Sequence, residues 1–166
     1  MMKWVVRAVL VVALFGLAFW GWKHFFPPPE VAIRNQLLEV ARLASFSSRE
    51  SALAKVAAVK NLMDACTDDI EISVDIQGYQ RQKFSGKEEL QQTAAIVRAH
   101  LTSLSVEFLD ITVTLAPNNQ AAIVNLTAKI RVPGDKEFFP QELKFDMKKV
   151  DGKWLIRKIE TVRTLQ

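Results

Sequence analysis

The chain has 166 residues, and its 22 Lys and Arg residues slightly outnumber its 18 Asp and Glu residues. Residues 1–29 hold three of these bases and no acid, so the remainder is nearly neutral, with 19 bases and 18 acids. This balance excludes the broad basic surface that nucleic-acid binding requires. One cysteine and two histidines are too few for a disulfide or a typical zinc site. We therefore expect no nucleic acid, metal or other cofactor among its ligands.

Residues 1–26 form an apolar segment in which Arg7 is the only charged residue between Trp4 and Trp22. A 19-residue helix spans roughly 28 Å, about the hydrocarbon thickness of a bilayer, when an arginine near its end reaches back to the interface. The bulky aromatic residues after this run differ from the small residues that precede a signal-peptidase site, and they are typical of a membrane interface. Cleavage of the segment as a secretory signal is the alternative. We predict a retained single-pass signal-anchor with these interface residues: Trp4, Arg7, Trp20, Trp22, Lys23, Phe25 and Phe26.

Residues 27–29 are three prolines, which cannot continue a helix and favour an extended spacer. Lys3 and Arg7 precede the apolar run, whereas Lys23 follows it, and this bias favours a cytoplasmic N-terminus. We therefore expect a protein of the bacterial inner membrane, with residues 30–166 forming one domain in the periplasm.

Two amphipathic helices are predicted at the start of this domain, over residues 30–44 and about 49–66. Ser47 and Glu50 form a capping box, which would satisfy free backbone amides at the start of the second helix. The residues at helical spacing that we expect to form its buried stripe are Ala52, Val56, Val59 and Met63.

The period then changes from that of a helix to that of a strand. Residues 69–76 alternate strictly between polar and apolar side chains, and residues 79–84 can return as a second strand. Ser85 and Glu88 form another capping box, which opens a third helix whose apolar positions continue to Leu104.

The remaining chain is predicted to be almost entirely strand. Residues 117–120 and the Asp151-Gly152 dipeptide are turn signals, and each joins two alternating segments into a hairpin. The four predicted strands cover residues 105–116, 121–132, 138–150 and 154–162. Helices followed by such a meander predict an α+β domain in which one curved antiparallel sheet wraps over about three helices.

This order of elements, together with two sequence motifs, resembles the NTF2-like (SnoaL-like) superfamily. The first motif runs from Gly78-Tyr79 to Phe84-Ser85-Gly86-Lys87-Glu88-Glu89-Leu90, and the second is Asp151-Gly152-Lys153-Trp154-Leu155-Ile156-Arg157-Lys158-Ile159. The resemblance covers residues 30–166 and implies a cone, with a hollow at its wide end that can hold a small apolar ligand. It leaves the activity open, because one fold supports many functions.

Enzymes of this family place a carboxylate in the hollow, where burial adjusts its pKa for proton transfer. Among the acids, Asp110 is the one that we most expect to lie in an unusual environment, because alternation places it on the same strand face as Phe108. Asp75 and the only tyrosine, Tyr79, are further candidates for a catalytic site. A surface position or a local ion pair is the alternative for each of them.

Two functions therefore remain open. The first is a membrane-tethered, non-catalytic NTF2-like module, such as a scaffold subunit of a membrane complex. Such a module would bind a protein partner, a second copy through its sheet, or a small apolar ligand. The second is a lyase or isomerase that acts on an apolar substrate through a buried carboxylate. A carboxylate inside a cavity of a few hundred Å³ would favour the enzyme.

Overall fold

The computed structural model describes residues 27–75, 82–133 and 139–162. The predicted anchor with its interface residues Trp4, Arg7, Trp20, Trp22, Lys23, Phe25 and Phe26, and also Tyr79, lie outside the described residues. Within them, no helix combines the length and the apolar character needed to cross a membrane. The elements are α2 (Pro29–Ala44), α3 (Ala52–Asp64), β1 (Cys66–Val74), β2 (Gln82–Ser85), α4 (Lys87–His100), β3 (Ser105–Leu115), β4 (Ala121–Arg131), β5 (Phe139–Val150) and β6 (Lys153–Thr161).

One sheet of six strands forms the frame of the domain, in the order β2-β1-β6-β5-β4-β3. The predicted strands, hairpins and α+β class are confirmed, but the expectation of a purely antiparallel sheet is wrong. β1 and β6 run parallel, with Glu71 paired to Lys158 and Ser73 paired to Glu160. Turn signals in the sequence predict pairing only between strands that follow each other in the chain. The pairing of β1 with β6 joins segments more than 80 residues apart.

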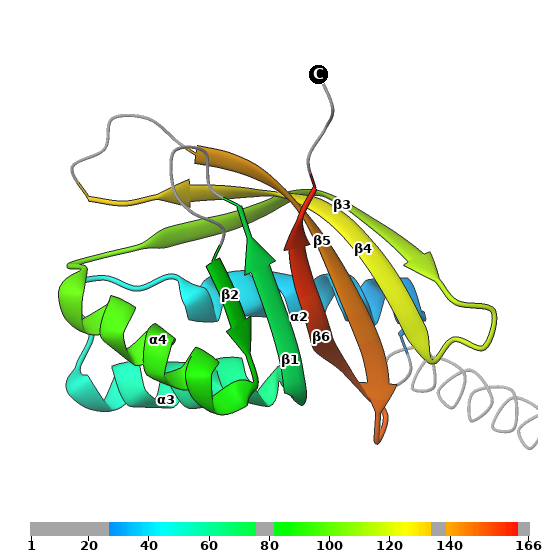
Figure 1. Ribbon diagram of the computed structural model, residues 1–166, viewed down its shortest axis with the longest axis horizontal. Helices are drawn as coiled ribbons and strands as arrows, with labels where there is room; N and C mark the ends of the chain where they lie inside the picture. The colour runs from blue at the N-terminus through cyan, green and yellow to red at the C-terminus, as the bar shows by residue number, and fades with distance from the viewer. Residues whose placement is uncertain (1–26, 76–81, 134–138, 163–166) are drawn as a thin grey trace, which may run out of the picture.

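Helix α2 supplies the apolar layer against which the sheet curves. Its fully buried residues Ile33 and Leu37 belong to the same core cluster as Phe145, which is 1% exposed. Figure 1 shows α2 running behind β6 and β5, with α3 and α4 stacked at one end of the sheet. A polar contact adds to the apolar one, because the Arg34 guanidinium donates a 2.8 Å hydrogen bond to the Ile111 carbonyl of β3.

A β-bulge interrupts strand β3. Its register with β4 shifts between Leu109 and Thr112, and Asp110 adopts a left-handed backbone conformation with φ 52°. The predicted unbroken alternation over this strand is therefore wrong at this point. Phe108 and Ile111 face the core, whereas Leu109 and Asp110 are both exposed. An extra residue in one strand bends it, and aspartate tolerates the left-handed conformation better than most residues.

The structure corrects the predicted start and buried face of the second helix. Ser51 is the N-cap of α3, and its hydroxyl accepts a 3.2 Å hydrogen bond from the Ala54 amide. Glu50 is therefore not part of a capping box with Ser47. The predicted stripe is only half correct, because Val59 and Met63 are buried, whereas Ala52 and Val56 are exposed.

The third helix also differs at both ends from its prediction. Gly86, with φ 85°, is the N-cap residue of α4, and the Glu89 carboxylate accepts a 2.7 Å hydrogen bond from the Ser85 amide. The helix ends at His100, so Leu104 lies beyond it and forms an isolated bridge with Phe46. Glycine can adopt a positive φ at low cost because it has no side chain. The Glu89 carboxylate satisfies the backbone amide of Ser85, which has no partner within the helix.

Candidate functional site

The face of the sheet that points away from α2, here called the outer face, carries charged and hydroxyl side chains. These side chains lie in register across neighbouring strands, because Ser85 pairs with Glu71, which in turn pairs with Lys158. The next row across the same three strands contains Lys83, Ser73 and Glu160. Alternation along the strands therefore gathers residues from distant parts of the sequence on one surface.

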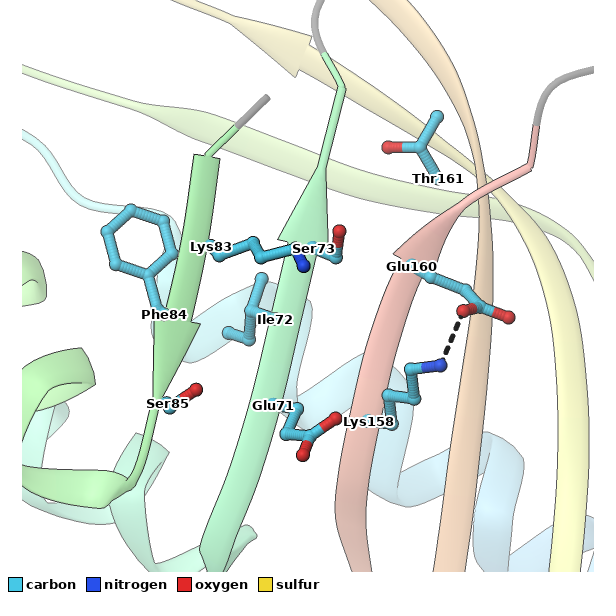
Figure 2. A pocket seen from close by; sticks show the side chains of 9 residues that line it. All are labelled: Glu71, Ile72, Ser73, Lys83, Phe84, Ser85, Lys158, Glu160 and Thr161. Atoms are coloured by element: carbon cyan, nitrogen blue, oxygen red, sulfur yellow. Dashed lines mark ion pairs between the residues drawn. The ribbon is translucent and has the colours of Figure 1, made fainter. Parts of the chain in front are cut away.

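A groove of about 360 Å³ opens on this outer face over β2, β1 and β6. It is lined by Glu71, Ile72, Ser73, Lys83, Phe84, Ser85, Lys158, Glu160 and Thr161. Figure 2 shows Lys83 extending from β2 toward Ser73 of β1, while Lys158 and Glu160 approach each other on β6. Its lining thus combines two cations and two carboxylates with hydroxyl groups and a small apolar part.

Glu160 connects the charges of the groove with those of the neighbouring strand. Its carboxylate lies 2.7 Å from the Lys158 ammonium and 3.0 Å from the Lys144 ammonium of β5. The hydrogen bond from Lys158, followed by that from Lys144, lowers the pKa of Glu160, and the same contact with Glu160 raises the pKa of Lys158. Glu160 and Lys158 are therefore charged at neutral pH, and a carboxylate held in this state is a poor proton acceptor.

The candidate catalytic residues do not meet in this groove. Asp110 is exposed at the β3 bulge. Asp75 is half-buried just after β1, where its amide donates to the Thr161 hydroxyl at 3.0 Å and its carbonyl accepts from Gln141 at 3.1 Å. Asp75 and Asp110 therefore lie on different parts of the sheet, after β1 and within β3. Tyr79 lies outside the described residues.

Cys66 is the only cysteine of the chain, and its side chain is buried at the start of β1. Burial raises the pKa of this thiol to about 11, so it stays protonated and a weak nucleophile at neutral pH. Across residues 27–75, 82–133 and 139–162, no three His, Cys, Asp or Glu side chains are grouped as a metal site requires.

The sequence predicts residues 69–76 and the last hairpin as separate segments, with no sign that their polar faces adjoin. The structure brings them together, because β1 lies between β2 and β6. Alternation indicated which side chains share a face, but no local signal indicated the parallel pairing that forms the groove.

Comparison with known proteins identifies the fold. No protein-family model matches the sequence, and no curated protein is detectably similar to it. An NTF2-like protein of unknown function from Pseudomonas putida superposes with a TM-score of 0.61 at 14% identity, over 82% of this chain and 87% of that one. The protein Aln2 from a Streptomyces species gives a TM-score of 0.61 at 12% identity, over 83% of this chain and 94% of that one.

A third solved structure, from Novosphingobium aromaticivorans, carries a provisional assignment as a scytalone dehydratase. It superposes with a TM-score of 0.59 at 14% identity, over 81% of this chain and 83% of that one. Identities this low establish a shared fold and carry no activity with them. The domain described here has the NTF2-like fold, with a mixed six-stranded sheet and three helices.

Proposed function

We propose that this chain is a non-catalytic NTF2-like binding module, tethered to the bacterial inner membrane by residues 1–26. Its domain lies in the periplasm and binds a protein partner through the outer face of the sheet, as a scaffold subunit of a membrane complex would.

The observation that carries this proposal is the composition of the groove on the outer face. Glu71, Lys83, Lys158 and Glu160 supply both signs of charge around it, with the Ser73 and Ser85 hydroxyl groups between them, whereas Ile72 and Phe84 belong to the opposite, core-facing side of their strands. Small-molecule sites are mostly apolar and enclosed, whereas protein interfaces combine apolar area with complementary charges. The groove therefore fits a protein surface better than a small apolar ligand.

The predicted tether supports the same function. Residues 27–29 are prolines, and α2 begins at Pro29, so only a short spacer separates the domain from residue 26. An anchor of this kind confines the domain to a thin layer above the bilayer. Confinement raises the effective concentration of another membrane-bound protein and makes a weak contact sufficient.

A lyase or isomerase has less support from the geometry. Such an enzyme needs a carboxylate in a dry hollow, where burial brings its pKa toward neutrality. Asp110 is instead exposed, and the pKa of Glu160 in the groove is lowered by its two lysine partners.

A photo-crosslinking amino acid placed at Asn125, an exposed residue of β4, tests the docking surface. The full-length chain is irradiated in intact membranes and its adducts are separated by mass. We expect one or a few discrete adducts from Asn125, because a docked partner holds the same groups beside this residue in every molecule.

The matched control places the same amino acid at Gln91, which is also exposed but lies on α4. We expect no discrete adduct from this position. Identical adduct patterns from Asn125 and Gln91, or none from either, would contradict docking through the outer face.

A further inference from the structure

Two neighbouring helices, α3 and α4, expose large apolar side chains to solvent. Leu53 and Val56 of α3 are 81% and 68% exposed, and Ile96 of α4 is 58% exposed. Side chains of this kind are usually buried, so a group of them on the surface marks an interaction site. With the exposed alanines beside them they form what we call the α3–α4 surface, which consists of Leu53, Val56, Ala57, Ala95, Ile96 and Ala99.

The apolar side chains of the two helices lie at the same end of the domain. Figure 1 shows α3 and α4 side by side and running in opposite directions, so the start of α3 lies beside the end of α4. An ion pair of 3.2 Å between the Arg98 guanidinium and the Glu50 carboxylate joins these two ends. Glu50 precedes Leu53 by three residues, and Arg98 follows Ile96 by two.

The charges around the α3–α4 surface are almost all positive. Residues 45–60 and 92–104 contain four bases and one acid, namely Arg49, Lys55, Lys60, Arg98 and Glu50. Glu50 is paired with the buried Arg98, and within the described residues the other three bases form no ion pair. The remaining acids of the two helices lie at their opposite ends, in the last turn of α3 and the first turn of α4.

We infer that the α3–α4 surface lies on the anionic phospholipids of the membrane that anchors the chain. A helix with exposed apolar residues and flanking bases lies in the membrane interface, with the apolar groups among the upper acyl chains and the bases beside lipid phosphates. This inference rests on the tether in the proposed function and adds a second membrane contact. A protein surface fits less well, because protein interfaces match charges of both signs, as the groove on the outer face can.

The short spacer before α2 allows this contact. The predicted anchor ends at residue 26 and α2 begins at Pro29, so the two prolines between them span no more than about 7 Å. Helix α2 has 16 residues and is therefore about 24 Å long. When α2 lies along the membrane, the anchor holds its start, and its end leads to α3 at the lipid surface.

This placement leaves the outer face of the sheet free for a partner. In Figure 1, β3 and β4 curve over one side of α2, whereas α3 lies on the other side. A domain that rests on lipid through α3 and α4 therefore directs the β4 part of the outer face away from the bilayer. Two membrane contacts hold this orientation better than a tether alone, and a preoriented surface loses less entropy when it binds.

Quenching of a fluorophore by spin-labelled lipids tests the inference on the full-length chain. The chain is reconstituted in vesicles of phosphatidylethanolamine and phosphatidylglycerol that include a lipid with a doxyl group near the top of its acyl chain. The Ala57→Cys variant carries the fluorophore, whereas Cys66 is buried and stays unlabelled. We expect the doxyl lipid to remove most of the fluorescence at position 57, because this residue lies at the depth of the quencher.

The matched control carries the same fluorophore on the Asn125→Cys variant, at an exposed position of β4. Both variants have the same tether and are measured in the same vesicles, so only the orientation of the domain distinguishes them. We expect no quenching at position 125. In vesicles of phosphatidylcholine alone, which carry no net charge, we expect weaker quenching at position 57, because the bases lack anionic lipids.

Substitutions at exposed positions separate the apolar contribution from the charged one. We expect the pair Leu53→Ser and Val56→Ser, and also Lys60→Glu alone, to reduce the quenching at position 57. Ile123→Ser removes an exposed apolar residue of β4 and is expected to leave this quenching unchanged. Circular dichroism of each variant checks that the domain remains folded.

An unquenched label at position 57, or equal quenching at positions 57 and 125, would overturn the inference. Discrete polypeptide adducts from a photo-crosslinking amino acid at Leu53 in intact membranes would also overturn it, by assigning the surface to a protein. A chain that floats with the vesicles in a density gradient while position 57 stays unquenched would leave the proposed function standing. A chain that does not float with them would remove both the tether and the inference.

Discussion

Arg98 joins three separate segments beneath α4. Its side chain is only 6% exposed, and its guanidinium donates to the Leu43 carbonyl at the end of α2 and, at 3.2 Å, to the Glu50 carboxylate. It also lies 4.8 Å from the ring centroid of Phe46, within cation–π range. Arginine suits this position because its planar donors can satisfy several acceptors at once.

We expect Arg98→Met to lower the free energy of unfolding by about 2–3 kcal/mol, because the Leu43 carbonyl and the Glu50 carboxylate would lose their donor. Denaturant unfolding of the detergent-solubilised chain, followed by circular dichroism, measures this change. Arg42→Met removes an exposed arginine that pairs with Glu39 on α2, and we expect no measurable change from it. Equal effects of the two substitutions would contradict the special role of Arg98.

Sequence reasoning at the scale of single residues succeeded where alternation alone determined the answer. Alternation over residues 69–76 and 138–150 separates an apolar face, which includes Ile70 and Phe145, from a polar one, and both of these residues are 1% exposed. Sequence reasoning did not anticipate the buried Arg98, because a charged residue on a helix predicts solvent until its partners are known. The partners of Arg98 lie 48 and 55 residues earlier in the chain, so no local pattern connects them.

At the scale of elements, the long strands were predictable and the helix ends were not. Alternation and turn signals placed β3, β4, β5 and β6 within one or two residues of their observed bounds. Helix starts depend on which of several serines provides the cap, and Ser47, Ser48 and Ser51 all precede α3. Tertiary contact decides among them, because Glu50 pairs with Arg98 instead of closing a capping box.

The corrected cap of α3 gives a direct comparison. We expect Ser51→Ala to destabilise the domain by about 1 kcal/mol, since the Ala54 amide loses its acceptor. Ser47→Ala, at the cap that sequence alone predicts, should leave the unfolding midpoint unchanged, because only its backbone carbonyl is bonded, to the Glu50 amide. Denaturant unfolding of both variants measures their free energies of unfolding. A larger loss of stability for Ser47→Ala than for Ser51→Ala would support the cap predicted from the sequence.

At the scale of the whole molecule, the α+β architecture was predictable because each hairpin is local in sequence. The parallel contact of β1 with β6 was not, since β2, α4, β3, β4 and β5 lie between these two strands in the sequence. This contact brings Glu71 of β1 beside Lys158 of β6 and forms the groove of the candidate site. The site was therefore less predictable than the fold that carries it.

The two ends of the molecule have different tasks in the function that we propose. In this proposal, residues 1–26 would hold the chain at the membrane, and the outer face of the sheet would make the contact that this placement favours. The two tasks are separable, because the groove residues lie on β1, β2 and β6, whereas the tether enters the domain at Pro29 of α2.

Membrane fractionation of cells with protease added from outside tests the central claim most directly. We predict that the full-length chain stays with the membranes after a carbonate wash, and that protease added to spheroplasts digests the domain, because the proposed topology places residues 30–166 outside the inner membrane. A soluble chain lacking residues 1–26, or a membrane-bound domain that protease reaches only after lysis, would contradict the account.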